Sequence, residues 1–480
     1  MNFNDYIFDE TFTVHGIFTL NKSDLPGGIN CNLIHKPGEI TLQTFGLLTD
    51  NEKKSSFMLF EELEQTKIYG MDDNANIIIL DVDETPYGNV KFPGFPIMYY
   101  RVKEYKVFNI YYNEVDINIR DKKSLELLIK ELEDNIEIEH LIFNYDYLKE
   151  WIGKNVSYIK IDKNNEETSF GVKLSDYKST IVNIEEFEMK LKDELSTSND
   201  FKELQIKQNY YFKLFNDGNQ KIDLEKAILL SKKIKQFIEM LVDFPLNFTN
   251  INFVYKHKSV DKFGKIPLIR GKVLFPQTIV NKTYKNQQFE NKRLSEIEMS
   301  FSKAINNWIS MQDKLNFIVN QHLSILYRNT YLENKLVDVI RNLEVFHRTF
   351  IETDGKIKLS DSEKLINELI LSKIEEVLKD EKDLKYYKTK LNKEYRSFTL
   401  KDRLSYLFEE IPEVLKEKIF HNEETIEVFV NKLKDTRNYY THGDKKSKNV
   451  ITDINEMYSA YNKCKLILSY YLLKQLEIEN

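Results

Sequence analysis

The period of the hydrophobic pattern changes along this chain of 480 residues, and that change constrains the fold most strongly. Residues 8–180 carry short segments rich in Ile, Val, Phe, Tyr and Thr with partial alternation, separated by turn sequences such as Pro26-Gly27-Gly28. The clearest of these segments are Thr11–Leu20, Glu39–Leu47, Asn76–Asp81 and Tyr99–Tyr112. One helical stretch, Asp121–Glu133, interrupts them. The pattern predicts a β-rich domain over residues 1–180, an antiparallel sandwich-like or barrel-like module.

Helical spacing dominates the chain beyond Arg293. Apolar residues from Leu332 to Phe350 recur every three or four positions, which indicates a helix that packs on others. Further helices are expected to begin at side chains that can cap them, namely Ser360 with Glu363, Thr399, Thr425, and Asp453 with Glu456. These signals predict an all-α bundle over residues 320–480.

The segment between these two regions, residues 181–319, is mixed. Asp223–Val242 has the apolar spacing of a helix, whereas Phe253–Pro276 has the composition of strands. We therefore expect an α+β protein with domains at 1–180, 181–319 and 320–480, since one core does not stay compact over this length.

Composition narrows the class of protein further. The two cysteines, Cys31 and Cys464, lie at opposite ends of the sequence, so they form neither a disulfide framework nor a metal-ligand motif. The N-terminus shows no signal peptide, and no apolar run approaches the roughly 18 residues of a membrane span. These features favour a soluble, cytoplasmic protein with no membrane partner.

A basic segment near the C-terminus contrasts with the net charge of −7. Residues 431–450 contain six basic side chains against two acidic ones, the basic ones being Lys432, Lys434, Arg437, Lys445, Lys446 and Lys448. Such a segment can attract a polyanion locally. On charge alone, a solvated lysine-rich loop is the favoured explanation.

Arg437 and His442 occupy unusual positions within that segment. Arg437 lies four residues after Leu433, on the face that the preceding turns bury, where a guanidinium requires an anion, a partner subunit or a cleft. His442 precedes Gly443, which marks a helix end. On a continuous helix two residues five apart diverge by about 140°. Convergence then requires either a break in the helix before His442 or two copies of the motif facing each other.

An arginine and a histidine are also the two groups that metal-free RNA cleavage needs. RNA supplies its own nucleophile, the 2′-hydroxyl; histidine moves protons near neutral pH, and arginine stabilises the charge that gathers on phosphorus. The spacing alone is a weak pattern, however. An arginine whose stem passes over Leu433 and a histidine that caps the helix account for it without catalysis.

The run Arg437-Asn438-Tyr439-Tyr440-Thr441-His442 resembles the signature of HEPN ribonucleases: arginine, a polar residue, three variable residues and histidine. It stands between the last two helices of a C-terminal bundle, as in that family. The segment Leu343-Glu344-Val345-Phe346-His347-Arg348 is similar to an earlier HEPN helix that supplies an acidic residue near the site.

The N-terminal region resembles the corresponding domain of ApeA-type proteins, which are bacterial anti-phage effectors ending in a HEPN domain. The segments that carry this resemblance are Phe12-Thr13-Val14-His15-Gly16, Pro26-Gly27-Gly28, Ile40-Thr41-Leu42 and Tyr147-Leu148-Lys149-Glu150-Trp151-Ile152-Gly153. One departure is a charged insert, Asp380–Arg396, which is longer than a minimal HEPN domain needs.

The resemblance implies a metal-independent, cofactor-free endoribonuclease that leaves a 2′,3′-cyclic phosphate, acts on host RNA such as tRNA, and arrests growth after a phage-derived trigger. It implies a homodimer or dimer of dimers through the HEPN domain. His442 would be the acid and base, Arg437 would bind the transition-state phosphate and Asn438 would position it. An inactive HEPN scaffold that binds RNA or a partner protein is the alternative, and a sensor whose toxic component is a separate chain is a third.

Several other side chains are candidates for supporting roles. Glu344 could orient Arg437 or His442, or simply pair with Arg348 four residues later. Lys445, Lys446, Lys448 and Tyr439 are candidate RNA contacts, the lysines through backbone phosphates and the tyrosine through stacking. His347 lies on an apolar helix stripe, which favours a core histidine, and Tyr440 is expected to pack.

Overall fold

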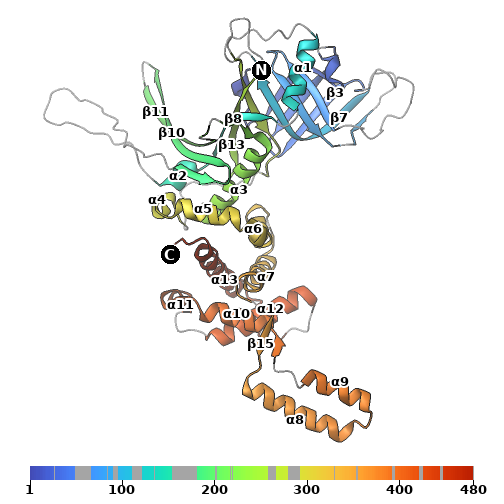
Figure 1. The fold of residues 1–480 in the computed structure, drawn as a ribbon, viewed down its shortest axis with the longest axis vertical. Coiled ribbons are helices and arrows are strands. Elements are labelled where there is room, and N and C mark those ends of the chain that lie inside the picture. Colours follow the sequence, from blue (N-terminus) through green and yellow to red (C-terminus); the bar gives the residue numbers. More distant parts are fainter. Residues whose placement is uncertain are drawn as a thin grey trace, which may run out of the picture. The chain divides into compact units, whose positions relative to one another are not determined.

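The chain forms two compact units, Met1–Ile309 and Ser310–Asn480, in the computed structural model (Figure 1). The described residues are 1–25, 27–48, 66–83, 85–89, 96–110, 122–133, 136–153, 181–200, 203–216, 218, 220–257, 266–278, 292–328, 330–352, 355–391, 395–420, 425–443 and 447–478. The expected boundary at residue 180 lies outside them. The second expected boundary, at 319, falls within a helix of the second unit.

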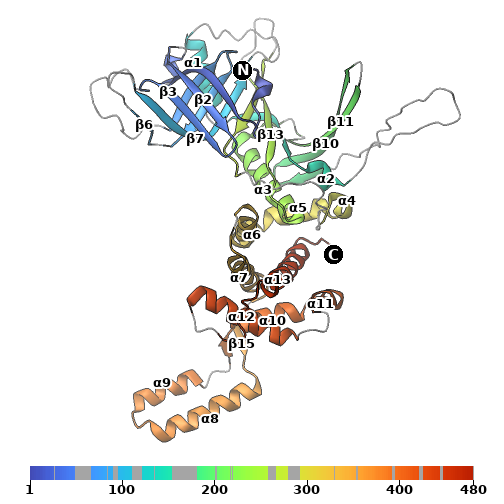
Figure 2. The ribbon, with the colours of Figure 1, turned by 180° about the vertical axis from the view of Figure 1, so that it is seen from behind.

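The first unit contains a closed β-barrel, which Figure 2 shows from behind. Its strands are β1 Phe12–Thr19, β2 Ile29–Lys36, β3 Glu39–Phe45, β4 Lys67–Asp72, β5 Ile77–Val82 and β7 Ile97–Asn109, with the short β6 Tyr87–Asn89 beside β7. The ring runs β3-β2-β1-β4-β5-β7, all antiparallel, and closes where β3 pairs with β7. The prediction of a β-rich antiparallel domain is confirmed, and its form is a barrel.

Side chains from alternating positions of the strands fill the interior of the barrel. Val14 and Phe18 of β1 are fully buried. Gly70 on β4 faces the Phe18 ring so closely that an added Cβ would lie 2.2 Å from it. His35 of β2 is buried as well; its Nε2 donates to the Phe8 carbonyl at 3.1 Å, so its Nδ1 accepts from Tyr105 at 3.0 Å.

The long strand β7 also starts an open sheet. Its second half pairs with β14 Leu268–Leu274, and the sheet continues in the order β14-β13-β8-β11-β10-β9. The remaining strands are β8 Glu137–Tyr145, β9 Ile181–Ile184, β10 Phe187–Asp200, β11 Glu203–Phe215, β12 Ile222–Asp223 and β13 Phe248–Lys256. Strands from both sides of residue 180 therefore belong to one sheet.

Helices complete the first unit. The longest is α3 Leu224–Val242, which Asp223 caps by accepting a hydrogen bond from the Lys226 amide, and α3 packs on β8. The others are α1 Lys122–Glu133, α2 Leu148–Ile152, α4 Leu294–Ile297 and α5 Phe301–Ser310, and two 3₁₀ turns cover Phe3–Asp5 and Lys22–Asp24.

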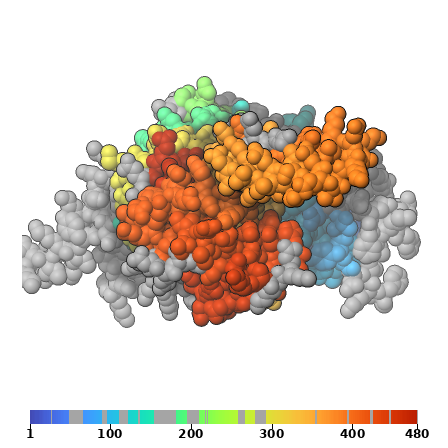
Figure 3. Space-filling model, turned by 90° about the horizontal axis from the view of Figure 1, so that it is seen from below, coloured from blue at the N-terminus to red at the C-terminus, as the bar shows by residue number. Residues whose placement is uncertain are grey.

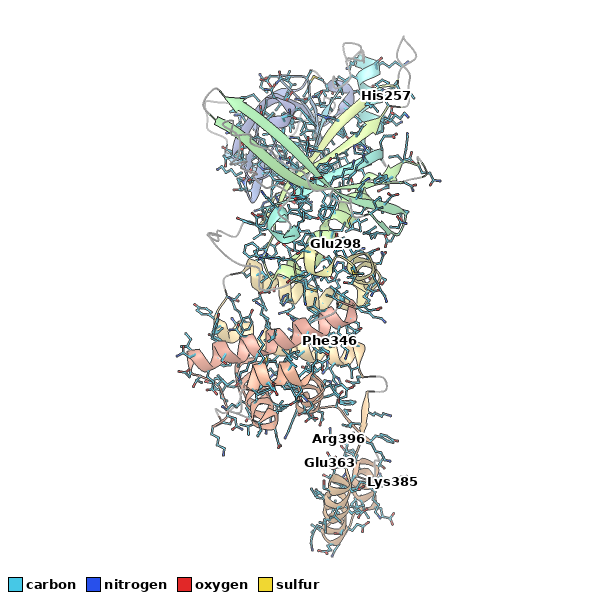
Figure 4. The ribbon with its side chains drawn as sticks, turned by 90° about the vertical axis from the view of Figure 1, so that its left-hand side faces the viewer. His257, Glu298, Phe346, Glu363, Lys385 and Arg396 are labelled. Atoms are coloured by element: carbon cyan, nitrogen blue, oxygen red, sulfur yellow. The ribbon has the colours of Figure 1, made fainter. Side chains whose placement is uncertain are left out.

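The second unit is a helical bundle built around α7 Leu332–Phe350. The other helices are α6 Gln312–Tyr327, α8 Asp361–Val377, α9 Glu381–Leu391, α10 Leu400–Glu409, α11 Glu413–Phe420, α12 Ile426–His442 and α13 Ile454–Gln475. The predicted stripe of α7 is buried, with Phe346 (Figure 4) against Tyr471 of α13 at a ring distance of 5.3 Å. The prediction of an all-helical region is confirmed apart from one short strand pair, β15 Lys356–Lys358 with β16 Tyr395–Ser397.

All four predicted caps are present. Ser360, Thr399, Thr425 and Asp453 each accept a hydrogen bond from a backbone amide in the first turn of their helix. None of the helices in the described ranges combines the length and the apolar character that a membrane span requires.

Candidate active site

The motif residues lie on the last two turns of α12. Thr425 begins this helix, and Phe429, Val430, Leu433 and Thr436 form its buried face. The helix continues through His442 and ends at Gly443, whose φ of 68° is left-handed and whose amide donates to the Tyr439 carbonyl at 3.0 Å. Arg437 and Asn438 are half-buried here, whereas His442 is exposed to solvent.

The side chains of Arg437 and His442 meet within a single chain. Arg437 Nη1 lies 3.1 Å from His442 Nε2, and it also donates to Asn438 Oδ1 at 3.2 Å. A guanidinium only donates, so Nε2 accepts and the imidazole is neutral with its proton on Nδ1 in this arrangement. The expectation that convergence needs a helix break or a second copy is wrong, because the long arginine side chain spans the angle around an unbroken helix.

Glu344 of α7 connects the motif to the core of the bundle. It is only 7% exposed. Its Oε1 accepts from Arg348 Nη2 at 2.6 Å, and its Oε2 lies 3.7 Å from Arg437 Nη2. Glu344 therefore makes both contacts that the sequence left as alternatives, the pair with Arg348 and the contact with Arg437.

Arg403 of α10 belongs to the same network and was missed in the sequence. It is 6% exposed. Its Nε donates to Glu352 Oε2 at 3.0 Å, its Nη1 donates to the Phe398 carbonyl at 2.9 Å, and Nη1 lies 3.7 Å from Glu344 Oε1. Its position, three residues after Leu400 and four before Leu407, is the signal that could have identified it, since it places an arginine on a buried stripe.

His347 is completely buried beside this network, which confirms the prediction of a core histidine. Its ring packs against the rings of Phe398 and Tyr406, with centroids 5.2 and 5.3 Å away. Within the described part of the chain, neither ring nitrogen has a hydrogen-bond partner, and Nδ1 lies 3.8 Å from Glu352 Oε2. Burial, and next the charge of Arg403, lower the pKa of His347 below its ordinary 6.5.

The network carries an excess of positive charge. Three guanidinium groups (Arg348, Arg403 and Arg437) surround two carboxylates, those of Glu344 and Glu352. Among the described residues of this network, the guanidinium groups therefore exceed the carboxylates by one positive charge. Such a charge favours an anion at this end of α12.

The segment after the motif is tied back to α12. Asp435 Oδ2 accepts from Ser447 Oγ and from Asn449 Nδ2, both at 2.9 Å, and Thr436 Oγ1 accepts from the Ile451 amide at 2.9 Å. These bonds hold residues 447–451 close to the helix end that carries the motif.

The candidate RNA contacts are placed only in part. Lys445 and Lys446 lie outside the described residues, whereas Lys448 is described and exposed. Tyr439 is half-buried and packs edge-on against Tyr440 at a ring distance of 5.0 Å. Tyr440, which the spacing placed on a packed face, is 36% exposed.

Within the described ranges, no group of three or more His, Cys, Asp or Glu side chains has an arrangement that could hold a metal ion. The described side chains that contact Arg437 include the amide of Asn438, the imidazole of His442 and the carboxylate of Glu344.

Comparison with known proteins identifies both units. The model of ApeA N-terminal domain 1 matches residues 13–308, and the model of the Apea-like HEPN domain matches residues 337–480, which include Glu344, Arg437 and His442. No curated protein and no solved structure matches the chain. The first match covers more than half of the sequence and the second covers the motif. This chain belongs to the ApeA family of anti-phage proteins, in which an ApeA N-terminal domain is joined to a C-terminal HEPN nuclease domain.

Proposed function

We propose that this protein is a metal-independent endoribonuclease that cleaves host RNA, tRNA included, during phage infection and thereby arrests growth. The observation that carries the proposal is the contact of 3.1 Å between Arg437 Nη1 and His442 Nε2, at an exposed helix end inside the HEPN match. Both groups match what cleavage through the RNA 2′-hydroxyl requires.

The proposed reaction is an internal transfer at one phosphodiester. The 2′-oxygen attacks phosphorus, its proton passes to His442, the bond from phosphorus to the 5′-oxygen breaks, and a proton is returned to that oxygen. The products are a 2′,3′-cyclic phosphate and a free 5′-hydroxyl. Arg437 neutralises the charge that develops on the phosphoryl oxygens, Asn438 positions the phosphate, and Glu344 holds the guanidinium.

Substrate binding would also free His442 to act as the catalytic base. Without RNA, His442 Nε2 accepts a hydrogen bond from Arg437, so its lone pair is occupied. A phosphate that draws the Arg437 donors toward its own oxygens frees Nε2 to take the 2′-hydroxyl proton. Because the phosphate must bind Arg437 before His442 can accept the proton, proton transfer depends on correct placement of the phosphate. The enzyme would act as a homodimer or a dimer of dimers, with the ApeA domain sensing infection or restraining the nuclease.

Growth of a bacterial host carrying the gene tests the proposal. Wild type should arrest growth after infection, whereas Arg437→Ala and His442→Ala should not. The arginine is worth about 10²–10³-fold in rate and the histidine about 10²–10⁴-fold. Arg341→Ala and His15→Ala serve as controls, since both side chains are exposed and lie outside the network. Equal arrest by the motif variants would favour an inactive scaffold or a separate toxic chain.

Loss of RNA cutting on addition of EDTA would contradict the metal-free mechanism.

A further inference from the structure

The helical hairpin formed by α8 and α9 is the least buried part of the second unit. Neither helix contains a single buried residue. Figure 3 shows the surface of this hairpin in orange. Helix α9 of this hairpin makes up most of the charged insert Asp380–Arg396, which a minimal HEPN domain does not need. The proposed cleavage reaction does not assign a function to the hairpin.

The hairpin exposes a large apolar surface. Leu365, Ile366, Leu369, Ile370 and Val377 of α8 are between 44% and 77% exposed, and Tyr386 and Tyr387 of α9 are 53% and 40% exposed. A groove of about 790 Å³ lies between the two helices and is lined mainly by apolar groups, among them Leu369, Val377 and Tyr386. Short helices gain most of their stability from packing an apolar face. Exposed apolar side chains gathered around a groove mark a site that another surface covers.

The charges of the two helices indicate what covers it. Helix α8 carries five acidic and two basic side chains, and α9 carries four basic and two acidic ones. The net charges are therefore −3 and +2. Within the hairpin one pair already joins the helices, Lys388 with Glu375 at 2.8 Å.

A surface built from one acidic and one basic helix is complementary to itself. If two copies meet around a two-fold axis, α8 of each faces α9 of the other, and every contact occurs twice. An RNA strand would be repelled by α8 and would leave its leucine and isoleucine side chains in water. A second copy of the hairpin satisfies both the charges and the apolar groups.

The base of the hairpin is held in a defined orientation on the bundle. Arg396 of β16 donates to Glu363 of α8 at 2.7 Å and to Asp402 of α10 at 2.9 Å, and Figure 4 shows Arg396, Glu363 and Lys385 at this end of the unit. The strand pair β15–β16 adds backbone hydrogen bonds between the segment that leads into α8 and the segment that follows α9. An element held in this way can present its surface to a partner without a large loss of entropy.

We propose that the α8–α9 hairpin is a self-association element that pairs with the same hairpin of a second copy, α8 against α9. This contact does not involve the Arg437–His442 motif. A chain with two separate two-fold surfaces assembles beyond a pair, so hairpin pairing would join HEPN pairs into larger assemblies.

A matched pair of substitutions tests whether the apolar surface associates. Val377 on α8 is 77% exposed and Val414 on α11 is 79% exposed, so glutamate at either position should leave the fold intact. Sedimentation of the full-length protein over a dilution series should show association at least tenfold weaker for Val377→Glu and unchanged for Val414→Glu. Identical curves for wild type and both variants would overturn the proposal, whether or not the protein cuts RNA.

Charge exchange tests the pairing of unlike helices. In Lys385→Glu/Lys388→Glu/Lys390→Glu both helices become acidic, and in Glu368→Lys/Glu375→Lys/Glu376→Lys both become basic. Each variant alone should fail to pair through the hairpin, whereas an equal mixture should recover the wild-type mass. If the equal mixture keeps the mass of the separate variants, the proposal is overturned. Unchanged mass together with at least tenfold weaker RNA binding by the acidic variant would assign the hairpin to RNA instead.

Discussion

Glu344 lies where the motif meets the core of the bundle, and each of its oxygens faces a different set of arginines. Oε1 is shared by Arg348 and Arg403, and Oε2 faces Arg437. Arg403 is buried, whereas the side chain of Arg348 is 55% exposed. The two arginines therefore contribute very differently to stability, although they bind the same carboxylate.

Replacing Arg403 with methionine should destabilise the second unit by about 3–5 kcal/mol, because it leaves Glu352 and part of Glu344 buried without their partner. Arg348→Ala is the control, and it should cost at most about 1 kcal/mol because its pair is exposed to water. Chemical unfolding measured for both variants tests this difference. Equal losses of unfolding free energy in the two variants would mean that burial does not make the ion pair of Arg403 more important for stability than that of Arg348.

His347 should make the second unit sensitive to acid. Its pKa is below the ordinary 6.5 in the folded chain, mainly because of burial, so unfolding takes up a proton between the lowered value and 6.5. The stability contributed by the neutral ring is complete above pH 6.5 and is lost as the pH falls below it. Buried His35 and half-buried His140, whose pKa values are also lowered mainly by desolvation, have the same effect in the first unit.

Comparison of wild type with His347→Gln isolates the contribution of this side chain. The unfolding free energy of the variant should fall less steeply than that of wild type between pH 6.5 and 5. The slope is the quantity to compare, since the substitution also changes packing. Parallel curves would show that His347 does not titrate on unfolding.

At the scale of single residues, the sequence was sufficient where a motif or a local spacing carried the information. Arg437, His442 and Asn438 were predicted together and lie together, and His347 was predicted to be buried. Arg403 was not found: its place on the stripe of α10 marks it as buried, but its partners Glu352 and Glu344 lie 51 and 59 residues earlier, and spacing within one helix cannot reveal those contacts. Their roles in catalysis remain predictions.

Helix α12 ends at the motif, and its C-cap fixes where the helix stops. Gly443 has a φ of 68°, and among the described residues no atom beyond its chain neighbours lies within 4 Å of the Cβ that a substitution would add. Alanine there should therefore cost about 1 kcal/mol through the left-handed backbone alone, and asparagine should cost less because it tolerates that conformation. Thermal unfolding of Gly443→Ala and Gly443→Asn measures the difference. A stabilising alanine would contradict this description of the cap.

Elements with strong local signals were predicted, and elements that depend on distant pairing were not. The caps of α8, α10, α12 and α13 were predicted from single side chains. Alternation along strands fits a sandwich and a barrel equally well, and closure depends on β3 pairing with β7 more than 50 residues away. The pair β15–β16 was missed because each strand has three residues and the pairing spans the whole hairpin.

The chain as a whole consists of two compact units, each with its own core. Gly271 of β14 faces the Phe253 ring, and an added Cβ would lie 1.9 Å from it. Gly271→Ala should therefore destabilise the first unit by about 1–3 kcal/mol through overpacking. We expect calorimetry to show one transition that Gly271→Ala lowers and another that Arg403→Met lowers. A single transition moved by both variants would show that the units unfold together.

The claim on which the function depends is that Arg437 and His442 of one helix act on one phosphodiester. Mapping of RNA ends in phage-infected cells tests it most directly, with wild type, Arg437→Ala and His442→Ala present at equal levels. We predict new ends carrying a 2′,3′-cyclic phosphate with wild type and none with either variant. The same ends at the same abundance with His442→Ala would contradict the claim.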